Sequence, residues 1–212
     1  MSAESRVIES DMTVHGKRNS RTMTLMSYTV GEKKSFTEYL SPARDKGTKM
    51  LKLDNQMWMY TPSTDRTILI SGHMLRQAVM GSDLSYEDLM VDRKLQEVYT
   101  PSLSGKEEVE GRMCHILLLH AKVSDAAYES QKIWVDAQWM IPLRQELYAK
   151  SGQLLKRIIL GNVQQVQGRW FPMKFNYKDM LKEGEGTDWV ITKIEFNKTI
   201  PEAVFSKASL KQ

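Results

Sequence analysis

Short runs of strand-type residues, separated by turn residues, recur along the chain and constrain its fold more than any other feature. In TKMLKLD (48–54), Leu51 and Leu53 alternate with charged residues, which is the period of a strand with one apolar face. The alternation and its turns predict a largely antiparallel meander. Strands are expected at 21–30, 35–41, 48–54, 57–60, 67–70, 94–100, 106–110, 112–121, 130–137, 142–150, 153–160, 162–167, 170–178 and 188–197.

Helices are expected to be few. We predict an N-terminal helix and loop within residues 1–19, and a helical turn within 75–80. The stretch VMGSDLSYEDLM (79–90) crowds acids, a tyrosine and a Gly-Ser-Asp turn together, as an active-site loop would. It also fits a helix start, with Ser85 as N-cap, Asp88 as the acid of a capping box and Leu89 behind them. We favour the helix start.

Length and charge narrow the class of protein. With 212 residues, 41% of them hydrophobic, the chain can bury a sizeable core, and we expect a single domain spanning 1–212. The net charge is +4, but the cations are dispersed, whereas a nucleic-acid binder concentrates them on one stripe. We therefore expect no nucleic-acid partner. Cys114 is the one cysteine, so no disulfide forms within the chain.

Motifs for common chemistry are missing. The sequence has no G-x-S-x-G elbow, no phosphate-binding loop of the Walker type and no G-x-G-x-x-G. His115 and His120 are five residues apart on one predicted strand, so they point to opposite faces and do not form a zinc pair. We expect no metal, no cofactor and no catalytic residue, although site residues can also assemble from distant strands.

Two predicted strands are apolar on both faces. HILLLHA (115–121) and LLKRIIL (154–160) offer leucine or isoleucine to either side. An antiparallel sheet with one face in water shows cleaner alternation than this. With few helices to cover a second face, the pattern indicates either a closed sandwich or a curved sheet around an apolar cavity.

Three segments resemble the LolA-like family of outer-membrane lipoprotein-sorting proteins. They are SPARDKGTKMLKLDNQMWMYTPSTDRTILISGHMLRQAVMGSDLSYEDL (41–89), IWVDAQWMIPLRQELYAKSGQLLKRIIL (133–160) and GRWFPMKFNYKD (168–179), and the resemblance spans about residues 20 to 206. It implies a mainly β fold, an incomplete and strongly curved antiparallel β-barrel, with a few short helices that form a lid. On this reading, the helix begun by Ser85, Asp88 and Leu89 belongs to the lid or mouth.

The resemblance also implies a function. A protein of this kind is expected to work in the periplasm and to hold acyl chains of a lipoprotein or lipid in a hydrophobic cavity, for transfer towards the outer membrane. It would receive them from an inner-membrane transporter and pass them to an outer-membrane acceptor. We expect the family's secretion signal to have been removed from this chain.

The same fold admits an alternative, a domain that senses lipid or lipoprotein in envelope signalling. For the cavity wall, we expect large apolar side chains of the predicted strands, each of which also suits an ordinary core. These candidates are Leu51, Leu53, Trp58, Tyr60, Leu117, Leu119 and Trp134.

Overall fold

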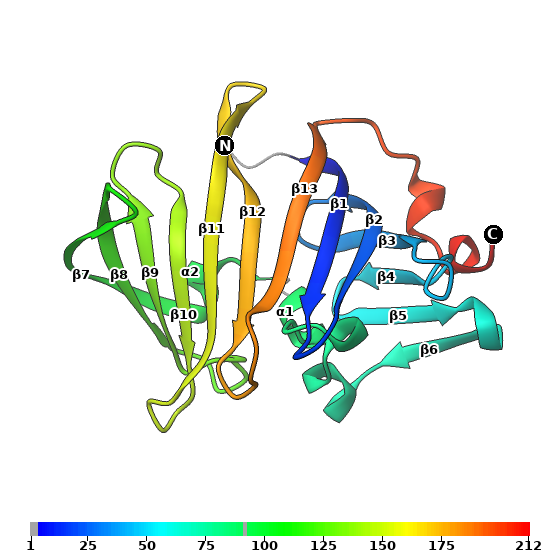
Figure 1. Ribbon diagram of the computed structural model, residues 1–212, viewed down its shortest axis with the longest axis horizontal. Coiled ribbons are helices and arrows are strands. Elements are labelled where there is room, and N and C mark those ends of the chain that lie inside the picture. The colour runs from blue at the N-terminus through cyan, green and yellow to red at the C-terminus, as the bar shows by residue number, and fades with distance from the viewer. Residues whose placement is uncertain (1–3, 91–92) are drawn as a thin grey trace. The chain divides into compact units, whose positions relative to one another are not determined.

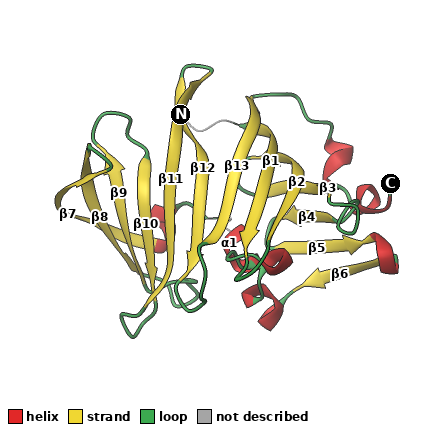
Figure 2. Ribbon diagram, in the orientation of Figure 1, coloured by secondary structure: helices red, strands yellow, loops and turns green. Residues whose placement is uncertain are grey.

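The structure is a computed structural model that describes residues 4–90 and 93–212. It is mainly β, with antiparallel strands and a few short helices, which confirms the fold class expected from the sequence (Figures 1 and 2). The strands are β1 Ser5–His15, β2 Ser20–Val30, β3 Lys34–Ser41, β4 Lys49–Leu53, β5 Gln56–Thr61, β6 Arg66–Ile70, β7 Tyr99–Val109, β8 Arg112–Ala121, β9 Ser130–Asp136, β10 Pro142–Tyr148, β11 Leu154–Val166, β12 Arg169–Asp179 and β13 Gly186–Phe196.

The helices are short. The α-helices are α1 Tyr86–Leu89 and α2 Leu95–Val98. The 3-10 helices are η1 Pro62–Thr64, η2 Gly72–Arg76, η3 Val79–Gly81, η4 Glu202–Phe205 and η5 Lys207–Lys211. No helix in the described residues is long and apolar enough to cross a membrane.

Two compact units make up the chain. Unit 1 holds the described residues of 1–14, 18–92 and 189–212, and unit 2 holds 15–17 and 93–188. In unit 1 the strand order is β6-β5-β4-β3-β2-β1-β13, and in unit 2 it is β12-β11-β10-β9-β8-β7. Most neighbours in each unit are also neighbours in sequence, so the predicted meander is observed. A single domain over 1–212 stays a prediction.

The predicted N-terminal helix is wrong, because residues 5–15 form strand β1. The segment lies between β2 and β13 in the strand order of unit 1. Asp11 accepts a hydrogen bond from Thr24 Oγ1 at 2.8 Å, and the Thr13 and Thr22 hydroxyls are 2.8 Å apart. β-Branched residues such as Ile8 and Thr13 suit a strand. Neighbouring strands supply pairing on both sides, which the local sequence does not reveal.

Unit 2 corrects two further boundaries. The predicted strand at 94–100 begins as the helix α2, and β7 starts only at Tyr99. The predicted strands 153–160 and 162–167 are one strand, β11, which continues through Gly161-Asn162. Asn162 takes a positive φ of 49°, a conformation that asparagine tolerates better than most residues. The two residues that read as a turn are therefore an irregularity within a long strand.

The stretch 79–90 starts a helix, with the predicted capping box in place. The Ser85 backbone N–H donates to Asp88 Oδ2 at 2.7 Å, and the Ser85 hydroxyl lies 2.8 Å from the same oxygen. Glu87 and Asp88 both lie in the first turn, where the helix dipole favours negative charge. The Tyr86 hydroxyl lies 3.3 Å from Met59 Sδ and so ties α1 to β5.

Candidate functional site

One face of the unit 2 sheet is apolar and carries the helix α2. Val98 of α2 packs with Leu119 and Ile133, and Leu117 and Val135 border the same cluster. Strand pairing sets Leu117 opposite Ile133, so the two strands β8 and β9 present one continuous wall. We call this wall the α2 face and define it by Leu117, Leu119, Ile133 and Val135.

The α2 face is incompletely covered. Leu119 and Ile133 are buried, with 4% and 7% of their surface exposed, but Leu117 and Val135 are only half-buried. The neighbouring amides of Gln131 and Gln145 do not interrupt the wall with an unpaired group, because Gln145 Nε2 donates to Gln131 Oε1 at 2.6 Å. An apolar wall whose polar groups are hydrogen-bonded can hold an apolar ligand without leaving a hydrogen-bond donor without an acceptor.

The opposite face of unit 2 is different in character. Trp134 lies there in a cluster with Cys114, Ile116 and Leu143, and Leu118 borders that cluster. The same side carries a row of charged residues from β9 to β12. We call it the charged face and define it by Lys132, Trp134, Arg144, Glu146, Arg157 and Lys178.

In unit 1, one face of the β3–β5 sheet is filled by the end of the chain. Leu51 and Trp58 pack with Phe36, and Phe205 and Leu210 from η4 and η5 complete this C-terminal cluster. Leu53 and Tyr60 border the cluster, half-buried. Lys207 Nζ lies 4.2 Å above the Trp58 ring, so a cation covers the rim.

The other face of the same strands is rich in methionine. Pairing sets Met50 opposite Met59, and Met57 lies two residues from Met59 on β5. The hydroxyl of the buried Tyr39 lies 3.8 Å from Met50 Sδ, and α1 approaches through Tyr86. Burial raises the pKa of Tyr39 far above its usual value, so this phenol stays neutral. Methionine adapts its shape to varied apolar neighbours.

The structure separates the residues expected to line one cavity. It brings Leu117 and Leu119 together on the α2 face and places Trp134 on the opposite, charged face. The other four candidates, Leu51, Leu53, Trp58 and Tyr60, lie in unit 1 at the C-terminal cluster. Ser85, Asp88 and Leu89 form the start and end of α1.

Sequence reasoning did not single out the methionine face or Ile133 and Val135. The signal for the methionines was present in QMWMY (56–60), where Met57 and Met59 alternate with Trp58. Trp58 was instead predicted to line the cavity, and it lies on the face that the C-terminal cluster fills.

The buried Asp136 carboxylate of unit 2 is engaged in holding its structure. The Arg112 guanidinium grips the buried Asp136 carboxylate, which also accepts the backbone N–H groups of Gln138 and Trp139 at 2.8 and 2.6 Å. The hydrogen bond from Arg112 is the main cause that lowers the pKa of Asp136 to about 2. Burial raises the pKa of the Cys114 thiol, which disfavours a reactive thiolate. Within the described residues, no three metal-ligating side chains gather at one point.

Comparison with known proteins agrees with this architecture. A family model described as "Uncharacterized protein" matches residues 31–212. A DUF1329 family protein from Desulfovibrio piger has 25% identity and a TM-score of 0.87, with 99% of this chain and 92% of that chain covered. No curated protein matches the sequence.

Two further crystal structures share the fold. A domain described as an outer membrane lipoprotein-sorting protein, from Vibrio parahaemolyticus, has 24% identity and a TM-score of 0.84, with 98% of this chain and 92% of that chain covered. A LolA superfamily protein from Nitrosomonas europaea has 21% identity and a TM-score of 0.80, with 99% and 93% covered. The chain therefore belongs to the family whose model spans residues 31–212, and the LolA-like fold expected from its sequence is confirmed.

Proposed function

We propose that this protein is a periplasmic carrier that binds the acyl chains of a lipid or lipoprotein. The observation that carries the proposal is the α2 face, an apolar wall whose Leu117 and Val135 side chains remain half-buried. The fold supports it, because a structure of the same fold is described as an outer membrane lipoprotein-sorting protein domain.

The energetics of such a site require apolar area more than specific polar groups. Each buried methylene contributes about 0.8 kcal/mol, so a chain of about sixteen carbons contributes roughly 12 kcal/mol before the costs of binding. Leu117, Leu119, Ile133 and Val135 provide branched aliphatic surface for that contact. Neither catalysis nor a cofactor is needed for this function.

Short helices suit the role of a lid, and we assign that role to α1 and α2. Each has four residues, and α1 is held by its capping box and by the Tyr86 contact to Met59. An element tied by few contacts opens at a lower free energy than the sheet beneath it. Opening of α2 would uncover Leu119 and Ile133, on which Val98 packs.

Delivery requires a donor and an acceptor whose affinities for the acyl chains match that of this protein. The free energy of acyl burial must be replaced by a partner or a membrane at the receiving end. We propose an inner-membrane transporter as donor and an outer-membrane acceptor. The Vibrio parahaemolyticus domain, described as an outer membrane lipoprotein-sorting protein domain, supports this assignment.

The function can be tested on protein secreted to the periplasm of a Gram-negative host. Mass spectrometry of an organic extract should detect acyl lipids that co-purify with the protein in near-stoichiometric amounts, because a closed apolar site releases them slowly. A protein secreted and purified in the same way but with a different fold serves as the control. Equal lipid content in both extracts would contradict the proposal.

A further inference from the structure

The charged face carries a row of side chains that acyl binding does not use. In the strand register, Lys132 of β9 lies opposite Glu146 of β10. Arg157 of β11 lies opposite Glu146 on one side and opposite Lys178 of β12 on the other. Directly paired residues of an antiparallel sheet project from the same face. Arg144 is two residues from Glu146 on the same strand, so it projects from that face too.

Trp134 fixes two of these cations in place. Lys132 Nζ lies 4.4 Å from the centroid of the Trp134 ring, and Arg144 Cζ lies 4.5 Å from it. The ring itself is buried, with 1% of its surface exposed, and its Nε1 donates to Glu107 at 3.0 Å. Two cation–π contacts on one immobile ring hold both positive charges at the sheet surface.

Most of the positive charge in the row is not neutralised. Burial opposes ionisation of Glu146, but hydrogen bonds from Tyr148 and Arg144 outweigh it and lower the pKa of this carboxyl. Glu146 is thereby committed to Arg144. Along the described chain, no carboxylate lies at ion-pair distance from Lys132, Arg157 or Lys178. Four cations and one carboxylate leave the row with a net charge of +3.

Two arginines of the row have donors that the described residues do not satisfy. The Nε atoms of Arg144 and Arg157 are buried and have no hydrogen-bond partner. A buried donor of this kind needs an acceptor, and guanidinium groups bind phosphate oxygens through short, charge-assisted hydrogen bonds. The Nε atoms themselves are buried, but the Arg144 side chain is 32% exposed and Arg157 is half-buried, so part of each side chain contacts solvent.

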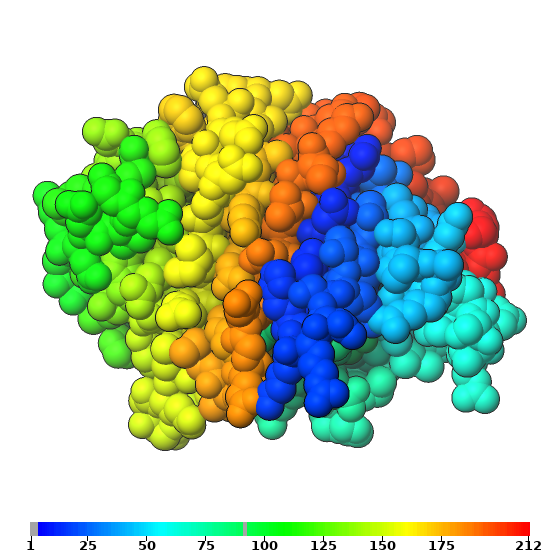
Figure 3. Space-filling view, in the orientation of Figure 1, coloured from blue at the N-terminus to red at the C-terminus, as the bar shows by residue number. Residues whose placement is uncertain are grey.

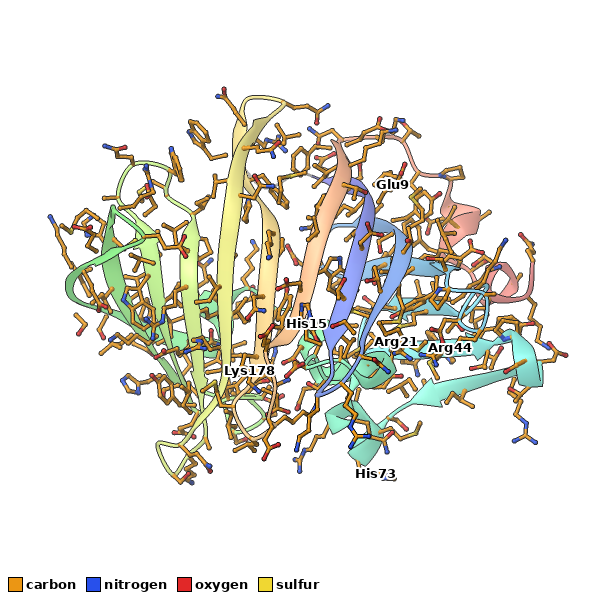
Figure 4. All side chains as sticks on the ribbon, in the orientation of Figure 1. Glu9, His15, Arg21, Arg44, His73 and Lys178 are labelled. Carbon is orange, nitrogen blue, oxygen red and sulfur yellow. The ribbon has the colours of Figure 1, made fainter. Side chains whose placement is uncertain are left out.

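The side of the sheet that bears this row is open. α2 packs on the opposite face, through Val98, and lies behind the strands in Figure 1. In the space-filling view of Figure 3, the yellow and light-orange residues of β11 and β12 are visible at the surface. Figure 4 labels Lys178, which ends the row on β12.

We propose that the charged face docks the protein on a bilayer that contains anionic phospholipids, with lipid phosphate groups bound at Arg157 and Lys178. Lys132 and Arg144 flank that contact and extend the positive surface. Each lysine or arginine near an anionic membrane surface strengthens binding by about fivefold. This docking is a second activity of unit 2, on the face opposite the proposed acyl site.

Vesicle sedimentation tests the docking with the full chain. Vesicles of phosphatidylcholine containing phosphatidylglycerol should bind the protein, and vesicles of phosphatidylcholine alone should bind it much more weakly. The double substitution Arg157→Gln, Lys178→Gln should weaken binding to the anionic vesicles by roughly 25-fold, because two contributions of about fivefold are lost. The thermal midpoint of the double variant shows that it is folded.

A charge-matched variant separates the site from net charge. Lys106→Gln, Lys150→Gln removes two exposed cations that lie outside the row, and it should bind the anionic vesicles nearly as well as the parent. An equal loss in both double variants would overturn the proposal, as would no preference for anionic vesicles, the outcome expected if an acidic protein were the partner. Full displacement by inorganic phosphate at the same phosphate concentration would also overturn it, because it would indicate a single-ion site.

Discussion

Asp136→Ala should lower the free energy of unfolding by about 3 kcal/mol, the largest loss we expect from a single substitution. Asp136 is 1% exposed and accepts hydrogen bonds from Arg112, Gln138 and Trp139. Alanine would leave two backbone N–H groups without their acceptor. It would also free the Arg112 guanidinium, whose Cζ lies 3.3 Å from the Trp139 ring centroid. Urea unfolding followed by tryptophan fluorescence measures the loss.

A surface carboxylate provides the control. Glu183 pairs with Lys17, but both side chains are about three-quarters exposed. Glu183→Ala should therefore change the free energy of unfolding by less than about 0.5 kcal/mol. Equal effects of the two substitutions would mean that the Asp136 network contributes no more than a solvated ion pair.

The Asp136 carboxylate also predicts that the stability of the protein depends on pH. Its pKa is about 2 in the folded protein and near 3.8 in the unfolded chain. A depressed folded pKa gives stabilisation that is complete above the unfolded value and is lost as the pH falls towards the folded value. The parent should lose about 2 kcal/mol between pH 4 and pH 2 from this group, and Asp136→Ala should lack that component.

Leu117→Gln should weaken acyl binding by at least about tenfold, whereas Leu118→Gln should leave it nearly unchanged. The two leucines are adjacent on β8 and are both half-buried, but they project from opposite faces. Leu117 borders the α2 face, and Leu118 borders the cluster around Trp134. An amide placed in the acyl contact leaves polar groups without partners when the ligand is bound.

The pair is matched in stability as well as in chemistry. Both substitutions place an amide at a half-buried position, so we expect similar decreases in the thermal midpoint. Titration with a fluorescent fatty acid measures binding to each folded variant. Equal losses of affinity in the two variants would remove the α2 face as the acyl site.

The sequence predicted the strands and the start of α1 well because those features are local. Alternating side chains and turns located most strands, and the Ser85–Asp88 spacing located the capping box. The prediction of a helix in the N-terminal segment was wrong because the spacing of Ile8 and Met12 suits a helix as well as a strand. Pairing decides between them: β1 lies between β2, the next strand along the chain, and β13, which is distant in sequence.

The faces of the strands could not be predicted for a related reason. β8 is apolar on both sides, so periodicity alone does not say which side carries Leu117 and α2 and which carries Trp134. In unit 1, Leu51 and Trp58 have the composition of a cavity wall. Their neighbours Phe205 and Leu210 come from the far end of the chain, a packing that no local pattern reveals.

The central claim, that this protein binds acyl chains by burying methylenes, is tested most directly by a chain-length series. Saturated fatty acids of increasing length should displace a fluorescent fatty acid from this protein with steadily increasing affinity. Complete burial contributes about 0.8 kcal/mol per methylene, which is roughly fourfold in affinity, so a two- to fourfold gain per carbon is expected until the site is filled. An affinity that does not change with chain length, or no displacement at all, would contradict the claim.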